Sequence, residues 1–155
     1  MKYAALTFAL LTGCGGGLLL NGSKEMPNRV KWDHEPTVCT PEVGMDSYIK
    51  HALAEWGWGK YTEDCKKAEI VIVTNRDLDK GILGRATWWS GAQYCMIDIR
   101  VLSQFVITHE IGHCIGISHS DDIGSVMYPT YDGKRDTWVS PEDRRVLGDI
   151  KETVK

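Results

Sequence analysis

The sequence predicts a single domain of the α+β class, because helical and strand patterns fall in separate blocks along the chain. Apolar residues at helical spacing come first, over residues 45–56. Segments of strand character follow between residues 69 and 100, and further helices are predicted over 102–115 and from residue 140 onward. We therefore expect a small, twisted, mixed sheet packed with three helices. A chain of 155 residues with 43% hydrophobic content has material for one core and no room for two.

The composition excludes one class of partner. The formal net charge is −3 at pH 7, and the basic residues are scattered rather than clustered. A nucleic-acid-binding domain needs a concentrated basic surface, so we expect no nucleic-acid partner. We expect the protein to be a monomer.

The N-terminus has the features of a targeting segment. Met1-Lys2 provides a positive start, residues 3–12 form a short apolar run, and Leu11-Thr12-Gly13-Cys14 resembles the lipobox of bacterial lipoproteins. In such proteins the signal peptide is cut before the cysteine, which is then lipidated. An ordinary signal peptide, or an uncleaved anchor made from the apolar stretch over residues 3–20, would also fit this segment.

Each of these alternatives exports the domain from the cytoplasm. The lipoprotein alternative predicts a signal peptide over residues 1–13, a lipidated Cys14 with a flexible tether over 14–28, and a folded domain over 29–155. We therefore expect a protein of the cell envelope that is anchored to a membrane by lipid, with secretion as the alternative.

The remaining cysteines suit an oxidising compartment, because their number is even and two disulfides can use all of them. Three pairings are open. We favour Cys95 with Cys114, which would tie a strand to the 102–115 helix, and Cys39 with Cys65, which would bracket the first helix. Buried free thiols are the alternative.

The folded domain begins with strand-like residues 29–39, interrupted by Pro36. Thr40-Pro41-Glu42 has the chemistry of a helix start, with a capping threonine, proline at the first position and an acid that the helix dipole favours. Gly57 and Gly59 are expected to stop this helix. Its apolar face consists of Met45, Ile49, Ala52, Leu53 and Trp56.

Strands are predicted next. Residues 69–74 are apolar on both faces, which is typical of a strand inside a sheet covered on both sides. Residues 82–89 and 94–100 are predicted as two more strands, joined by a turn at Ser90-Gly91-Ala92. Trp88 and Trp89 are adjacent, so we expect one to pack inward and the other to face solvent or substrate.

The chain after residue 119 is predicted to be irregular as far as Gly133, because it is polar and interrupted by glycine. Ser140-Pro141-Glu142-Asp143 then repeats the chemistry of a helix start, with Asp143 three positions after the capping Ser140. The apolar side of this last helix consists of Val146, Leu147, Ile150 and Val154.

The 102–115 helix carries the motif most specific to a function. Residues 109–119 read H-E-x-x-H-x-x-G-x-x-H. Residues four apart share a helix face, so His109 and His113 can direct two imidazoles at one metal ion. Gly116 can take the left-handed conformation that ends a helix, and the resulting turn would return His119 as a third ligand.

Three histidines leave one coordination position open, as in catalytic zinc sites, whereas structural zinc sites are closed and rich in cysteine. Glu110 lies beside the first ligand and is not needed as a ligand, so we expect it to be the general base toward a zinc-bound water. A helix with surface histidines, or a zinc site without catalysis, would leave Glu110 without a role. Cys114 is not expected to bind the metal, because its position points about 100° away from the ligand face.

The sequence resembles the metzincin clan of zinc proteases, and within it the matrixins, the matrix-metalloproteinase type. The zinc consensus is shared by the whole clan. Ser120 directly after the third histidine, and Met127-Tyr128-Pro129-Thr130-Tyr131, resemble the matrixin Met-turn in residue type and distance. Weaker resemblance covers residues 68–72, 81–86 and 140–150. The resemblance implies the α+β catalytic domain of this family, with zinc in its cleft.

The resemblance also implies further site residues. Met127 would lie beneath the zinc, although from the residues alone it could equally be a core methionine. Pro129 and Tyr131 would line the pocket for the substrate side chain after the scissile bond, with ordinary packing as the alternative for Tyr131. Unpaired backbone groups at a sheet edge would bind an extended peptide across the zinc. The residues with these backbone groups are Leu83, Gly84 and Ala86.

Some features of the family are not found in the sequence. Nothing between Cys14 and the first strand resembles the family's inhibitory cysteine motif, so latency by that route is not expected. The family's structural zinc needs histidines before the active-site helix, where the chain has only His34 and His51. We expect these two at the surface or at strand ends, and no second zinc. Calcium is not supported by a clear motif, and the candidate ligands are Asp77, Asp79 and Asp98.

The predicted function is that of an exported zinc-dependent endopeptidase acting on a peptide or protein substrate. Zinc would polarise the scissile carbonyl, while Glu110 takes a proton from water and passes it to the leaving nitrogen. One alternative is an envelope lipoprotein that binds zinc and peptides without cutting them, against which the intact Glu110 argues. Another is a hydrolase of the peptide crosslinks of the cell wall.

Overall fold

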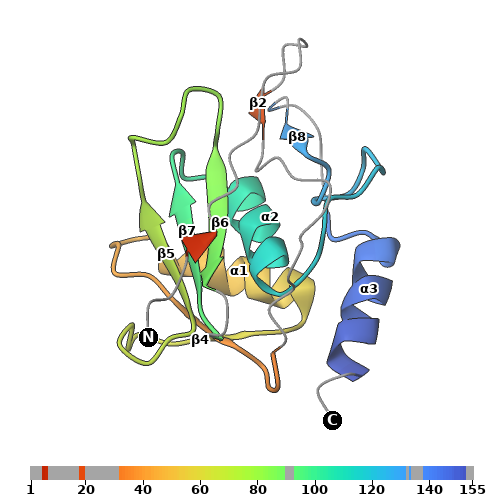
Figure 1. Cartoon of the computed structure of the whole chain (residues 1–155), viewed down its shortest axis with the longest axis horizontal. Coiled ribbons are helices and arrows are strands. Elements are labelled where there is room, and N and C mark those ends of the chain that lie inside the picture. Colours follow the sequence, from red (N-terminus) through yellow and green to blue (C-terminus); the bar gives the residue numbers. More distant parts are fainter. Residues whose placement is uncertain are drawn as a thin grey trace.

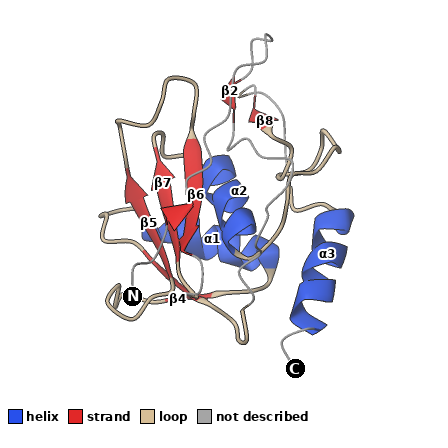
Figure 2. Cartoon of the chain, in the orientation of Figure 1, coloured by secondary structure: helices blue, strands red, loops and turns tan. Residues whose placement is uncertain are grey.

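The structure of the chain is a computed structural model, and it describes residues 5–6, 18–19, 32–89, 93–131, 133 and 138–152. In chain order its elements are β1 (Ala5–Leu6), β2 (Leu18–Leu19), β3 (Thr37–Cys39), α1 (Asp46–Trp56), β4 (Lys60–Tyr61), β5 (Ile70–Thr74), β6 (Gly84–Trp89), β7 (Cys95–Ile99), α2 (Gln104–Cys114), β8 (Thr130–Tyr131) and α3 (Pro141–Glu152). Helices and strands form separate layers (Figure 1, Figure 2). The α+β class predicted from the sequence is confirmed.

The main sheet is mixed and has the strand order β1-β6-β7-β5-β3-β4. β5 runs parallel to β3 and β7, and β3 runs parallel to β4. β6 is antiparallel to both β7 and β1. A small second sheet pairs β2 with β8. α2 packs against β6 and β7, so the helix that carries the histidine motif lies under the antiparallel part of the main sheet.

The helices cover one face of the sheet, and the other face is more open. Along β5, Ile70 and Ile72 are fully buried, whereas Val71 and Val73 are half-buried. The expectation of a sheet covered on both sides was therefore wrong. Valine suits a pleated, half-buried surface as well as a core, so an apolar run of this length does not distinguish the two.

The first helix begins later than predicted. The hydroxyl of Thr40 accepts a hydrogen bond from the backbone N–H of Glu42 at 3.0 Å, which forms a local turn in place of a helix cap. Gly44 follows with a positive φ of 83°, a conformation that interrupts any helix. α1 starts only at Asp46 and ends at Trp56, directly before Gly57, whose φ is 61°, as the sequence predicted for its end.

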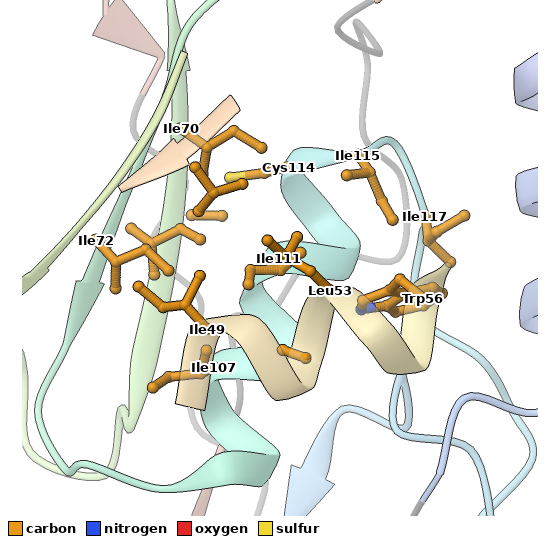
Figure 3. Packing of buried hydrophobic residues seen from close by; sticks show 14 of the residues in the cluster. Ile49, Leu53, Trp56, Ile70, Ile72, Ile107, Ile111, Cys114, Ile115 and Ile117 are labelled. Carbon is orange, nitrogen blue, oxygen red and sulfur yellow. The ribbon is translucent and has the colours of Figure 1, made fainter. Parts of the chain in front are cut away.

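The core forms where α1, α2 and the sheet meet (Figure 3). Ile49 and Trp56 from α1 and Ile111 from α2 are at most 1% exposed. Two indole N–H groups hold α2 at its middle and at its C-terminal end, because Trp56 donates to the carbonyl of Thr108 at 2.9 Å and Trp32 donates to that of Cys114 at 2.8 Å. These contacts fix the motif helix against the rest of the domain.

Both disulfides have the pairing that the sequence favoured. Cys95 on β7 is bonded to Cys114, the last residue of α2. Cys39 at the end of β3 is bonded to Cys65, so α1 lies within the loop that this bond closes. A cross-link that closes a loop limits the unfolded chain and stabilises the fold.

The last helix starts as predicted. The hydroxyl of Ser140 accepts a hydrogen bond from the N–H of Asp143 at 3.1 Å, and Oδ2 of Asp143 accepts one from the N–H of Ser140 at 2.8 Å. This reciprocal pair satisfies two backbone donors at the start of α3. The helix then runs to Glu152.

Several predictions concern residues outside the described ranges. They include the lipidation of Cys14, most of the predicted signal peptide and tether, the turn over residues 90–92, and Val154. Among the described helices, none combines the length and the apolar character that crossing a membrane requires.

Candidate metal centre

Three histidines meet at the end of α2 and the turn that follows it. His109 and His113 lie on α2, and Gly116, with φ of 103°, turns the chain back so that His119 faces them. One ring nitrogen of each histidine lies within 4.8 Å of the other two. The Nε2 atoms of His113 and His119 are 3.2 Å apart. The structure therefore brings together the three residues that the motif predicted.

Backbone carbonyls decide which ring nitrogen carries the proton. Nδ1 of His109 donates to the carbonyl of Val126 at 2.7 Å, and Nδ1 of His113 donates to that of Ile117 at 2.9 Å. A carbonyl can only accept, so each Nε2 keeps its lone pair. Nε2 of His109 is buried and has no hydrogen-bond partner among the described residues. A buried lone pair of this kind is what a metal ion would satisfy.

The electrostatics favour neutral imidazoles. Burial lowers the pKa of His109 well below its ordinary value, and the neighbouring His113 and His119 lower it further. Burial, together with His119, also lowers the pKa of His113 to about 3. Both rings are therefore neutral at pH 7, which is the form that binds a metal ion.

Glu110 is fully buried next to these rings. Its carboxylate oxygens have no hydrogen-bond partner of normal geometry among the described residues. Burial raises the pKa of Glu110 to about 8, although the backbone of Ala86 and the positive charge of Arg85 act in the opposite direction. A carboxyl group that is buried without a strong partner, on the residue after a histidine of this site, is a candidate acid or base.

Gly84 allows β6 to approach Glu110 closely. A Cβ atom on Gly84 would lie 2.7 Å from both Cγ and Oε1 of Glu110, and 2.8 Å from Cγ1 of Val106. The sequence indicated a substrate-binding role for Gly84 through its backbone. The structure adds a packing role beside the candidate acid or base, which the local sequence around Gly84 did not reveal.

Met127 packs against the motif helix between two of the histidines. It is completely buried, and a Cβ atom on Gly112 would lie 2.4 Å from its Sδ atom and 2.6 Å from the ring of Trp56. Only a residue without a side chain fits at Gly112, where the Met-turn and α1 converge on α2. The sequence reasoning had treated this position as variable and missed its role.

The predicted pocket wall includes one residue that the sequence reasoning missed. The ring of Tyr131 stacks on Phe105, with centroids 4.2 Å apart and planes at 15°. The ring of Phe105 in turn lies 5.9 Å from that of His109. Pro129 and Tyr131 are half-buried. Phe105 precedes His109 by one helical turn, and this spacing is the signal that could have identified it.

The sheet edge beside the site is only partly as expected. Leu83 was predicted to present unpaired backbone groups, but its carbonyl accepts a hydrogen bond from the N–H of Arg100 at 2.8 Å. In an antiparallel pair the hydrogen-bonded positions alternate, so the backbone groups of Gly84 and Ala86 are directed away from β7. Farther along β6, the backbone of Trp88 and Trp89 pairs with β1. This pairing lies beyond residues 83–86, for which unpaired backbone groups were predicted.

The two other histidines lie at the surface, as predicted. The side chain of His34 is 50% exposed and contacts Asp33 and Glu69, and hydrogen bonds to these two carboxylates raise its pKa. The side chain of His51 is 60% exposed and lies 3.3 Å from Glu55. Both are therefore placed to form surface ion pairs.

The adjacent tryptophans have different neighbours. The ring of Trp88 meets the ring of His113 edge-on, with centroids 6.4 Å apart. The ring of Trp89 contacts that of Tyr94 at 5.3 Å. Successive side chains of β6 point to opposite faces of the sheet, so Trp88 lies on the face that carries the metal centre.

The aspartates considered for calcium are engaged by protein groups. Oδ2 of Asp79 pairs with the guanidinium of Arg85 at 3.1 Å. The guanidinium of Arg100 donates to the backbone carbonyls of Leu78 and Asp79, both at 3.1 Å. These oxygens of Leu78 and Asp79 therefore already have cationic partners. The remaining candidates, Asp77 and Asp98, each interact with Asn75.

Comparison with known proteins gives one family. Residues 85–150 match the family model described as Matrixin. The chain is 62% identical to a matrilysin of Rattus norvegicus over 153 residues, which cover 70% of this chain and 53% of that protein. It is 63% identical to a matrilysin of Mus musculus over 151 residues, covering 68% of this chain and 53% of that protein.

A shorter match is to a collagenase. The chain is 65% identical to an interstitial collagenase of Aquarana catesbeiana over 26 residues, covering 17% of this chain and 7% of that protein. The chain spans about half the length of the two matrilysins. The chain is therefore similar to matrixins over residues 85–150, a stretch that includes the three-histidine site, and to matrilysins over about half of their length.

Proposed function

We propose that this chain is a zinc-dependent endopeptidase in which Glu110 is the general base. The observation that carries this proposal is the convergence of three imidazoles, together with a buried carboxylate on the residue that follows the first of them. His109, His113 and His119 are the proposed ligands, and two of them already have the neutral form and the tautomer that leave Nε2 available. Three protein ligands leave a coordination position for water or substrate.

The chemistry is divided between the ion and the protein. Zinc bound at this site would polarise a peptide carbonyl, lower the pKa of a water molecule and favour the ionised form of the nearby carboxylate. Glu110 takes a proton from that water and later delivers it to the leaving nitrogen. Its neighbours leave it little freedom, because it is fully buried on α2 and packed against the backbone of Gly84.

The substrate is proposed to lie along β6 as an extended peptide. The backbone groups of Gly84 that point away from β7 would pair with it, and the side chain of Leu83 is buried at 7% exposure beside them. The side chain after the scissile bond would enter the pocket lined by Pro129 and Tyr131. The match to matrilysins, of whose length this chain covers about half, supports a protein or peptide substrate.

We also propose that the domain works outside the cytoplasm. The support is the pair of disulfides, which form and persist in oxidising compartments. The proposed division is a signal peptide over residues 1–13, a tether that starts at a lipidated Cys14 and runs to residue 28, and a catalytic domain over 29–155. Mass spectrometry of the mature N-terminus would distinguish lipidation of Cys14 from simple secretion.

The proposal is tested by cleavage. The purified chain, loaded with zinc, is incubated with an unfolded protein and with a peptide library, and the fragments are identified by mass spectrometry. We expect internal cleavage that stops when a zinc chelator is added and returns when zinc is restored. Zinc binding without any cleavage would instead indicate a binding module, and release of cell-wall peptides alone would indicate a wall hydrolase.

A further inference from the structure

The segment Ser125–Met127 contacts the metal centre at several points. The carbonyl of Val126 accepts the hydrogen bond from Nδ1 of His109. The carbonyl of Met127 accepts one from the N–H of Ser120, the residue after His119, at 3.0 Å. The side chain of Met127 lies against Gly112, the residue before His113. A shift of this short segment would therefore disturb the surroundings of all three histidines.

The buried hydroxyl of Ser125 forms hydrogen bonds on the side of this segment that faces α3. Oγ of Ser125 donates to Oδ2 of Asp143 at 2.7 Å and accepts from the N–H of Met127 at 2.8 Å. Ser125 is completely buried, and Asp143 is 2% exposed. The same Oδ2 atom accepts the N–H of Ser140. The side chain of Ser125 thus connects the start of α3 to the segment under the histidines, next to the backbone hydrogen bond that the N–H of Val126 donates to the carbonyl of Trp138 at 2.8 Å.

The chemistry of serine suits this connection. A hydroxyl can donate to a carboxylate and accept from a backbone N–H at the same time, which alanine cannot do. A hydrogen bond to a charged acceptor is among the stronger ones in a protein interior. Loss of the Ser125 hydroxyl would leave the N–H of Met127 and one lone pair of Asp143 buried without their partners.

We propose that Ser125 and Asp143 are positioning residues that set the orientation of the histidine ligands through the backbone of Val126 and Met127. The inference rests on the zinc site proposed above, and neither residue touches the metal or the substrate. Groups that orient metal ligands in this way typically change metal affinity by about 10–100-fold when they are removed.

The test compares variants of the full chain by zinc affinity, measured in competition with a chromophoric chelator, and by the visible absorption of the cobalt-substituted protein. Ser125→Ala should lower zinc affinity by about 10–100-fold and alter the cobalt spectrum, because the ligand geometry changes. Ser125→Thr, which keeps the hydroxyl, should restore both. Asp143→Asn keeps an acceptor but loses the charge, so it should give an intermediate affinity.

Thr40 provides a matched control, because its buried hydroxyl also accepts from a backbone N–H and donates to a side chain, the Sδ of Met45. Thr40→Ala should lower stability while leaving zinc affinity and the cobalt spectrum unchanged. Parental affinity and spectrum in both Ser125→Ala and Asp143→Asn would overturn the inference. A parent chain that binds no zinc would overturn the proposed function as well, so the two failures are distinguishable.

Discussion

Gly112 offers a direct test of how the motif helix is packed. A Cβ atom there would lie 2.4 Å from Sδ of Met127 and 2.6 Å from a ring carbon of Trp56, whereas non-bonded heavy atoms normally approach to about 3.5–4.0 Å. Trp56 is 1% exposed and is held by its hydrogen bond to the carbonyl of Thr108. Neither neighbour can withdraw without losing other buried contacts.

Gly112→Ala is expected to lower the free energy of unfolding by about 1–2 kcal/mol. Overpacking of a buried site costs roughly 1–3 kcal/mol, and the better helix propensity of alanine offsets about 1 kcal/mol of it. The net loss of stability is therefore about 0–2 kcal/mol, and we expect a value in the upper half of this net range because both steric overlaps are severe. His113 is the next residue, so zinc affinity should fall by about 10-fold or more as the ligand moves.

Gly148 in α3 is the matched control, because a Cβ atom there meets nothing within 4 Å. Gly148→Ala should raise the free energy of unfolding by about 0.5–1 kcal/mol and leave zinc affinity unchanged. Thermal unfolding of the metal-free variants and chelator competition measure the two effects. If Gly112→Ala is as stable as Gly148→Ala and binds zinc as the parent does, the packing argument is refuted.

Three further predictions concern the pocket, calcium and pH. Phe105→Ala removes the ring stacked on Tyr131 and should enlarge the pocket for the substrate side chain after the scissile bond. The kcat/KM for peptides with a larger side chain at this position, relative to a smaller one, should rise by about 10-fold, and an unchanged ratio would contradict this prediction. Chelation of calcium with EGTA should leave the Tm unchanged, because Arg85 and Arg100 already pair with the oxygens of Leu78 and Asp79. A fall in Tm that added calcium reverses would contradict this prediction. In the metal-free protein the pKa of Glu110 is raised from 4.5 to about 8, which means that the folded state holds the proton of Glu110 more tightly than the unfolded state does. The stability that this protonated carboxyl provides is fully present below pH 4.5 and is lost as the pH rises to about 8. Metal-free Glu110→Gln should therefore exceed the parent in stability by about 3–5 kcal/mol at pH 8 and by little at pH 4.5, as measured by urea unfolding at both pH values.

Features that depend on local spacing could be predicted from the sequence. The positions of His109 and His113 follow from the period of a helix, and Gly116 was expected to turn the chain toward His119. The reciprocal hydrogen bonds of Ser140 and Asp143 follow from a motif three residues long. In each case neighbours in the chain determine the geometry, so no knowledge of the tertiary structure is needed.

Features that depend on contacts between distant parts of the chain could not be predicted from the sequence. The space at Gly112 is restricted by Trp56 and Met127, which lie far away in the chain. Ser125 looks like an ordinary loop serine until α3 brings Asp143 against it. Thr40 had the chemistry of a helix cap, but the positive φ of Gly44 prevents a helix there.

The same limit applies to the sheet. Val71 and Val73 looked like core residues, yet both are half-buried, because the described helices cover the opposite face of the sheet. Leu83 was expected to present unpaired backbone groups, but its carbonyl accepts a hydrogen bond from the N–H of Arg100. Local patterns predict that a strand exists, whereas the partners on its faces and edges depend on the whole fold.

The most direct test of the central claim compares the rates of peptide hydrolysis by the parent chain and by Glu110→Gln at equal zinc content. Both proteins should hold one zinc ion per chain, and the variant should be slower by about 10²–10⁴-fold, because the ligands remain and the proton acceptor is lost. Equal rates at equal zinc content would contradict the role of Glu110.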